Sequence, residues 1–148
     1  MPEYFDLSAL IKKDDRTSDE IVQSFKMALG KEGNSIANSK ILMTISENEG
    51  EDFIELCLSF PNQVFHKENS EEELRIFHRY AHKIFEKDVQ VKYIVCSYEL
   101  NGYLLGSIKS LNDIDERFLD KFPIAYKKKK DTNEVKTLLN LEAQDIFY

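Results

Sequence analysis

Residues 89–108, VQVKYIVCSYELNGYLLGSI, are the longest β-favouring run in the chain. Asn101-Gly102 lies near its centre, and this dipeptide favours a two-residue type I′ turn because both positions need φ > 0. The turn predicts a hairpin in which Leu100 lies opposite Tyr103. Apolar residues then fall on both faces of the two strands, which indicates a strand pair covered on both sides.

A second pair of apolar segments, KILMTIS and DFIELCLSF, flanks the polar turn at residues 47–51. These segments predict an earlier hairpin. Pairing Glu47 with Asp52 places Ile45 opposite Ile54, so that one face of the hairpin is apolar. Because side chains alternate along a strand, this register keeps the apolar set on a single side.

Three helices are predicted from capping boxes at residues 17–20, 70–73 and 110–113. In a capping box, two side chains satisfy backbone N–H groups that have no partner inside the helix. Apolar residues at helical spacing follow each box. Gly30 is expected to end the first helix, and Pro123 to close the short third helix.

These elements occur in the order α-β-β-α-β-β-α and predict an α+β fold. We expect an antiparallel sheet of four or more strands, built from two β-hairpins, with two or three helices packed mainly on one face. Residues 1–148 are expected to form a single domain. Residues 1–16 are a lead-in that docks as a short helix or strand, and residues 127–133 are a polar basic linker before a C-terminal segment.

The composition is that of a globular protein, with 42% hydrophobic and 32% charged residues. The net charge of −7 argues against general nucleic-acid or anionic-membrane binding, and suits either solubility or a partner with a basic surface. No apolar run approaches the roughly 20 residues that span a bilayer. Cys57 and Cys96 lie in predicted strands and fit free thiols in a reducing compartment, so a cytoplasmic location is expected.

His78 and His82 lie four residues apart on the second predicted helix, a spacing that places both imidazoles on one helix face, as in zinc sites. Residue 79 is Arg, however, so the metalloprotease pattern is missing, and no spacing supports a third ligand. Two partly exposed helix residues are the favoured interpretation of this pair.

Catalytic patterns find little support. The chain contains no GxSxG, GxGxxG or GxxxxGK[ST] sequence, and neither cysteine has a sequence-local activating partner. The acidic residues fall in turns and at helix starts, where capping and dipole effects explain them. The sequence therefore favours a non-catalytic protein without a cofactor.

The second face of the predicted sheet carries apolar residues with no assigned cover. If the helices pack on the other face, a partner would contact Phe53, Tyr93, Val95 and Leu104. The chain's own termini are the favoured cover, and a second subunit or another protein are the alternatives.

Three functions remain open. The first is a non-catalytic protein-binding domain, with an immunity protein or inhibitor that docks a basic partner as its concrete form. The second is a small enzyme or ligand-binding domain with a pocket between sheet and helices. The third is a homo-oligomeric structural subunit that pairs through an edge strand or through the second sheet face.

Overall fold

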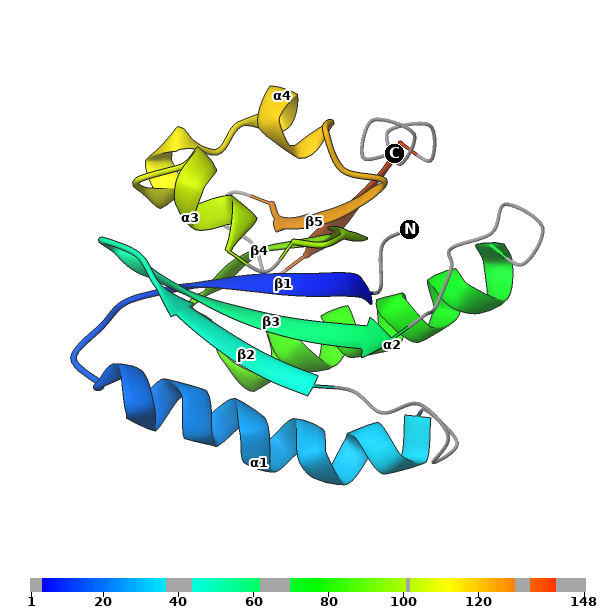
Figure 1. Ribbon diagram of the computed structural model, residues 1–148, viewed down its shortest axis with the longest axis horizontal. Helices are drawn as coiled ribbons and strands as arrows, with labels where there is room; N and C mark the ends of the chain where they lie inside the picture. The colour runs from blue at the N-terminus through cyan, green and yellow to red at the C-terminus, as the bar shows by residue number, and fades with distance from the viewer. Residues whose placement is uncertain (1–3, 37–43, 62–69, 101, 130–133, 141–148) are drawn as a thin grey trace.

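The computed structural model describes residues 4–36, 44–61, 70–100, 102–129 and 134–140. Two long helices separate the strands in the first two thirds of the chain, and short helices and two further strands come after them (Figure 1). The elements in chain order are β1 (Tyr4–Lys12), α1 (Ser18–Ile36), β2 (Thr44–Glu49), β3 (Phe53–Pro61), α2 (Ser70–Lys87), β4 (Val91–Tyr98), α3 (Tyr103–Ser107), the 3₁₀ helix η2 (Leu111–Asp113), α4 (Glu116–Leu119), β5 (Ile124–Lys128) and β6 (Val135–Leu139).

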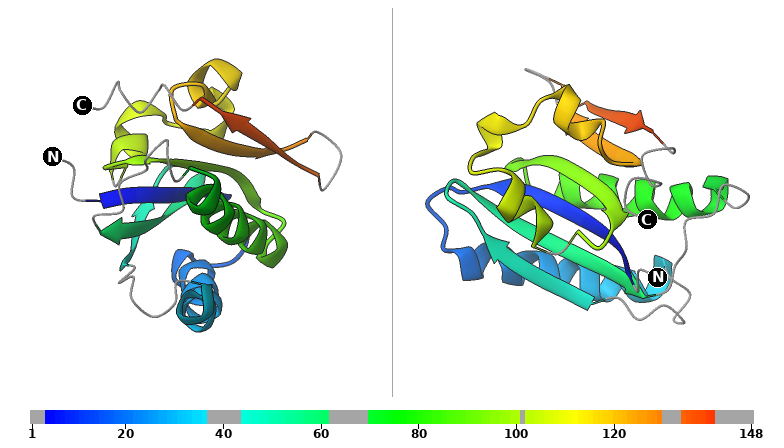
Figure 2. Two further views of the ribbon diagram at one scale, coloured as in Figure 1. Left: turned by 90° about the vertical axis from the view of Figure 1, so that its right-hand side faces the viewer. Right: turned by 45° about the horizontal axis from the view of Figure 1, so that its top comes forward.

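Six strands form one sheet in the order β2-β3-β1-β4-β5-β6, and every neighbouring pair is antiparallel. The predicted fold class, α+β with an antiparallel sheet of more than three strands, is confirmed. The first four strands and the two long helices follow the β-α-β-β-α-β order of ferredoxin-like folds. β5 and β6 extend the sheet beyond β4, at the end opposite β2 (Figure 2).

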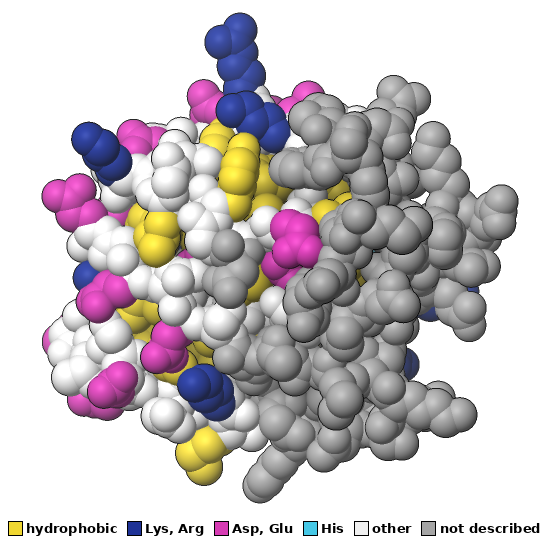
Figure 3. Space-filling model, in the orientation of Figure 1, with side chains coloured by type: hydrophobic (Ala, Val, Ile, Leu, Met, Phe, Trp, Pro, Cys, Tyr) yellow, Lys and Arg dark blue, Asp and Glu magenta, His cyan; other side chains and the backbone are white. Residues whose placement is uncertain are grey.

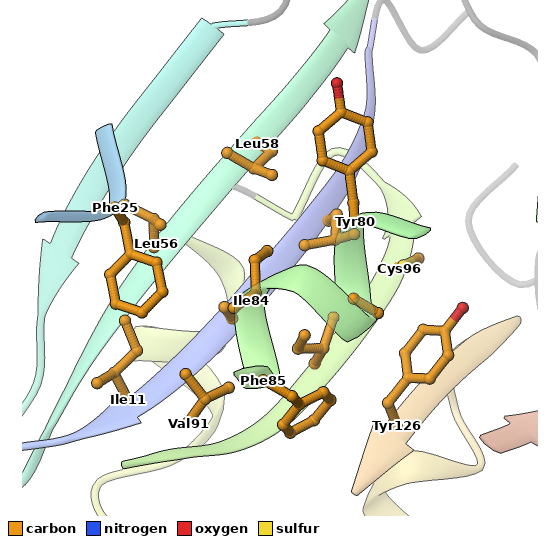
Figure 4. Close-up of a cluster of buried hydrophobic side chains, with 14 of the residues drawn as sticks. Ile11, Phe25, Leu56, Leu58, Tyr80, Ile84, Phe85, Val91, Cys96 and Tyr126 are labelled. Carbon is orange, nitrogen blue, oxygen red and sulfur yellow. The ribbon is translucent and has the colours of Figure 1, made fainter. Parts of the chain in front are cut away.

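The two faces of the sheet have different covers. α1 and α2 lie against one face, called here the first face, while α3 and α4 lie on the opposite side, called the second face (Figure 1). On the first face, Phe25 of α1 and Tyr80 and Ile84 of α2 pack onto apolar side chains of the strands (Figure 4). The two long helices thus share one face, as predicted.

β1 corrects the prediction of a lead-in. It lies between β3 and β4, in the interior of the sheet. The predicted order therefore lacked its first strand. In the segment YFDLSALIK, the alternate residues Phe5, Leu7 and Ala9 are buried on the first face, while Asp6 and Ser8 are buried on the second. The polar residues inside the strand hid its central position.

The predicted hairpin at residues 89–108 is wrong in its second half. β4 forms as a strand, but its neighbours are β1 and β5, so that Cys96 lies opposite Leu7 and Ile124. After β4 the chain turns, Gly102 adopts φ 83°, and α3 begins. Asn101 lies outside the described residues. An Asn-Gly dipeptide specifies the backbone of a turn, but it does not decide whether a strand or a helix comes after that turn.

The earlier hairpin is confirmed as β2 and β3, but its register is wrong by four residues. Ile45 lies opposite Leu58, where the sequence predicted Ile54. The turn is tighter than expected, because the N–H of Gly50 donates to the carbonyl of Phe53 over 2.9 Å. A shift by an even number of residues leaves each side chain on its predicted face. The predicted pairs of residues 41 and 43 lie outside the described residues.

Gly50 is required by close packing at this turn. A Cβ atom built there would lie 2.5 Å from Cε1 of Phe53, whose side chain is fully buried. The ring cannot move away freely, so a larger residue at position 50 would force the turn to open.

The helix starts are closer to prediction than the ends. Thr17 Oγ1 accepts from the N–H of Glu20 over 3.1 Å, and α2 begins at Ser70. α1 continues through Gly30 to Ile36, which corrects the predicted stop. A glycine inside a helix costs only about 1 kcal/mol and need not end it. The predicted third helix is divided into η2 and α4, and the capping box at Ser110 is present.

The C-terminal part differs from the predicted linker. β5 extends through Lys128, so the run of lysines starts inside a strand. β6 lies further along the chain at Val135–Leu139, while residues 130–133 and 141–148 lie outside the described residues. Within the described residues, none of the helices has the length and apolar character needed to cross a bilayer.

Candidate functional site

The second face of the sheet is covered by the chain's own segment between β4 and β5. Residues of α3, η2 and α4 pack on the sheet and form a second core, separate from the one under α1 and α2. Its fully or largely buried members are Leu10, Phe53, Val95, Leu100, Leu104, Ile108, Leu111, Ile114, Phe118, Leu119, Phe122 and Ala125. The sequence favoured the termini as the cover; residues 1–3 and 141–148 lie outside the described residues, and among the described ones the segment between β4 and β5 supplies the cover.

The four residues predicted to bind a partner lie in or against this second core. Phe53, Val95 and Leu104 have an exposed fraction of 0%, and Tyr93 packs partly buried beside them. As placed, these side chains stabilise the fold and offer little surface to a partner.

Carboxylates hold the cover in place. Asp52, in the β2–β3 turn, accepts from Ser110 Oγ over 2.8 Å and from the N–H of Leu111 over 3.2 Å. Asp113 accepts from the N–H of Ser110, and Asp115 caps α4. Asp113 and Asp115 therefore serve local backbone N–H groups, whereas Asp52 connects the β2–β3 turn to the distant start of η2.

The remainder of the second face is polar, and β1 adds Asp6 and Ser8 to the polar residues of β3 and β4. Along β1, Asp6 lies opposite Ser59 on one side and Ser97 on the other, while Ser8 lies opposite Cys57. All are at least nine-tenths buried. We call the six buried residues Asp6, Ser8, Glu55, Cys57, Ser59 and Ser97 the polar row. The signal for it was the alternation of polar and apolar residues in YFDLSALIK.

Glu55 is the most unusual member of the polar row, because its side chain is fully buried. Ser8 Oγ donates to Oε2 over 2.7 Å, and Asn48 Nδ2 donates to Oε1 over 3.1 Å. Burial raises the pKa of Glu55, and the nearby charge of Asp6 raises it further, while the two hydrogen bonds act in the opposite direction. The protonated form is therefore favoured more than in water.

Asp6 connects β1 to the start of the cover. Its Oδ2 accepts from the N–H of Leu100 over 2.8 Å. The hydroxyl of Ser97, opposite Asp6, is fully buried and has no hydrogen-bond partner among the described residues. Burying the Asp6 carboxylate and the Ser97 hydroxyl in the same interior lowers the stability of the fold.

The two cysteines have no nucleophilic character. Burial and the charge of Asp6 raise the pKa of Cys57 to about 12. Burial also raises the pKa of Cys96. Because the thiolate is the reactive form, both side chains are inert at neutral pH.

His78 has a structural contact. Its Nδ1 lies 2.6 Å from the hydroxyl of the buried Tyr126, and the two rings meet edge to face at 5.5 Å. Burial and the neighbouring His82 lower the pKa of His78, which favours the neutral ring, and in the tautomer with the proton on Nε2 the Nδ1 atom accepts from the hydroxyl. His82 is exposed. The described residues contain no cluster of three or more His, Cys, Asp and Glu side chains that could hold a metal ion.

Acidic side chains are spread over the described part of the face in Figure 3, with no single dense patch. Several are paired within the chain. Glu116 accepts from Lys127 over 2.7 Å and from Lys136 over 3.2 Å, which lowers the pKa of Glu116. The charge of −7 is thus distributed over the chain.

The outer edge of β6 carries backbone N–H and C=O groups that point away from β5. The N–H of Lys129 donates to the carbonyl of Glu134 over 2.8 Å, which sets the phase of the β5–β6 ladder. In an antiparallel ladder such pairs alternate with pairs that exchange no hydrogen bonds. Val135, Thr137 and Leu139 therefore direct their N–H and C=O groups away from β5, and no described strand pairs with that side.

The outer edge of β2 has the same geometry with different side chains. The pair formed by Gly50 and Phe53 places the outward backbone groups on Ile45, Glu47 and Glu49. Both glutamates are exposed and lie beside α1. The two edges of one sheet thus differ in charge.

Ion pairs to α1 and to the chain before it hold the β2 carboxylates. Glu49 accepts from Lys13 over 2.8 Å and from Ser18 over 2.9 Å, and Glu47 lies 3.8 Å from Lys26. Charged side chains on an edge strand oppose pairing with another strand. Thr137 and Leu139 on β6 are exposed and uncharged, with Leu139 at 52%.

Comparison with models of known families, with curated proteins and with solved structures finds no match to this chain.

Proposed function

We propose that this chain is a non-catalytic protein-binding domain whose binding element is the outer edge of β6. The observation that carries the proposal is the row of outward backbone groups on Val135, Thr137 and Leu139, with which no strand of the described residues pairs. An extended segment of a partner can add to such an edge as a further strand, with main-chain hydrogen bonds as the source of affinity.

The charge of the outward residues supports β6 over β2 as the binding edge. The outward residues of β6 are uncharged, whereas Glu47 and Glu49 of β2 are charged and engaged with Lys26 and Lys13. Natural sheets use charged residues in this way to prevent edge-to-edge association. An immunity protein or inhibitor that docks a basic partner stays a concrete form of the proposal.

A matched pair of proline variants tests the proposal. Thr137→Pro removes an N–H that β5 does not use, so the fold should persist while strand addition is lost. Glu47→Pro makes the same change on the β2 edge and serves as the control. Partner binding should disappear only in Thr137→Pro. Equal binding by both variants would place the interface elsewhere.

Hydrogen exchange gives an independent readout of strand addition. In the free chain, the N–H groups of Val135, Thr137 and Leu139 should exchange quickly, because they are not bonded to β5. Those of Lys136 and Leu138 should be protected in both states. Binding should protect the first set, and unchanged exchange on a bound complex would contradict strand addition.

Glu55 favours a second function, that of a ligand-binding or catalytic domain. A buried carboxyl with a raised pKa beside a second carboxylate is a pattern of acid–base sites. A catalytic Glu55 would need access to solvent and substrate. A ligand screen by melting temperature, repeated on Glu55→Gln, tests this function: a ligand that stabilises only the wild type supports it, and equal stabilisation of both proteins rejects it.

A further inference from the structure

The arrangement of β6 is self-complementary about Thr137. If two β6 strands pair antiparallel through their open edges, Thr137 lies opposite Thr137 of the second copy, and Val135 lies opposite Leu139. These are the same three residues whose backbone groups point outward. Every outward N–H and C=O within the strand then finds a partner in one two-fold arrangement.

The side chains suit this register. The outward residues lie on the first face, where Val135 and Leu139 form an aliphatic pair across the junction and the two threonines form a hydroxyl pair. On the other face Lys136 lies opposite Leu138, so no two lysines are directly opposed. Lys136 is in addition paired with Glu116 of its own chain.

The other edge does not allow the same arrangement. Pairing β2 with β2 of a second copy about Glu47 would place two carboxylates directly opposite each other. Pairing β6 with β2 of a second copy is heterologous, and the interface repeats from copy to copy unless the rotation closes a ring. The β6–β6 contact is isologous, so it closes with two copies.

We infer that the occupant of the β6 edge is a second copy of this chain, which makes a two-fold dimer with one sheet continuous through both subunits. This inference rests on the proposed function, since it names the partner of the proposed edge. One strand pair buries little area, so the dimer is weak, with dissociation at about micromolar or higher concentration.

Charged substitutions at Thr137, on the symmetry axis, test the inference. Thr137→Lys and Thr137→Glu each place two like charges opposite each other, so each variant alone should be monomeric where the wild type dimerises. A mixture of the two variants should form a heterodimer about fivefold or more tighter than either variant alone. Sedimentation velocity on the full chain across the micromolar range measures all three. A variant that failed to fold would not be rescued by mixing, so the mixture separates misfolding from lost contact.

A cross-link fixes the register. Thr137→Cys places two thiols on residues whose Cα atoms lie about 5.5 Å apart across the axis, within the range of a disulfide. The native Cys57 and Cys96 are buried and do not compete. Mild oxidation should give a covalent dimer with Thr137→Cys, and none with the matched variant Glu47→Cys.

The results separate the dimer from the wider proposal. A monomer at all concentrations, with no heterodimer and no cross-link, overturns the inference. If partner-dependent protection of the Thr137 N–H is then observed with a different protein, the proposed function stands without the dimer. If neither self-association nor a foreign strand protects that N–H, both fail.

Discussion

The two faces of the sheet are buried by different means. On the first face, two long helices present regular apolar stripes, and the strand residues beneath them are aliphatic or aromatic (Figure 4). On the second face, a run of three short helices covers only an apolar part, and the polar row occupies the rest. The first face is stabilised by pattern and packing, whereas the second also depends on individual hydrogen bonds.

This difference bears on the second candidate function, which rests on Glu55 of the second face. Buried carboxylates and an unsatisfied hydroxyl lower stability and are uncommon in an interior that serves packing alone. Among the described residues, the buried carboxylates Asp6 and Glu55 lie on the second face, and none lies in the first core. The proposed interaction edge lies on a third region, β6, at the end of the same sheet.

The largest expected loss of unfolding free energy comes from removing one buried phenylalanine side chain from each core. Phe53→Ala on the second face and Phe25→Ala on the first should each lower the free energy of unfolding by about 3–5 kcal/mol, because both rings are almost fully buried. Urea denaturation of the two variants measures the losses. A cost for Phe53→Ala below about 1 kcal/mol, with Phe25→Ala costly, would mean that the second face is a surface and not a core.

The sequence predicted the first face well because its signals are local. Helix stripes at α1 and α2 and the cap at Thr17 depend on neighbours within a few residues, and α2 begins at Ser70 as predicted. Strand faces were also predicted, because a register error of four residues between β2 and β3 leaves the alternation of side chains unchanged. The alternation of side chains does not encode which partner strand is chosen, so the register itself was not determined.

The second face could not be predicted because its determinants are distant in sequence. Glu55 meets Ser8 across 47 residues, and Leu100 meets Asp6 across 94. The central position of β1 was missed since Asp6 and Ser8 resemble surface residues until β3 and β4 flank them. The apolar residues after Gly102 were expected in a strand, although α3 also buries Leu104 on the same face.

A medium effect is expected from releasing the cover of the second face. Asp52→Ala removes the acceptor for Ser110 Oγ and the Leu111 N–H, and should cost about 0.5–2 kcal/mol of unfolding free energy. Exchange of the amides in η2 and α4 should rise more than exchange in α1 or α2. Uniform acceleration across all helices would instead indicate global destabilisation with no separate attachment of the cover.

The smallest effect, and the only gain, is expected from Glu55→Gln. The variant keeps the acceptor for Ser8 and a polar group for Asn48 but cannot ionise. Since the folded-state pKa of Glu55 is raised above 4.5, its contribution to wild-type stability is fully present below that pH and is lost as the pH rises through the folded pKa.

Glutamine should therefore change stability little below pH 4.5 and increase it progressively at higher pH, by about 1.4 kcal/mol for each unit of the raised pKa. Urea denaturation of both proteins from pH 4 to 8 gives the difference curve. Ser8→Ala is the matched control, because it removes a hydrogen bond that stabilises the carboxylate and should make the wild-type loss at high pH larger. A flat difference curve would mean that Glu55 is ionised in the folded protein as readily as in water, so that the hydrogen bonds from Ser8 and Asn48 offset the effect of burial on its pKa.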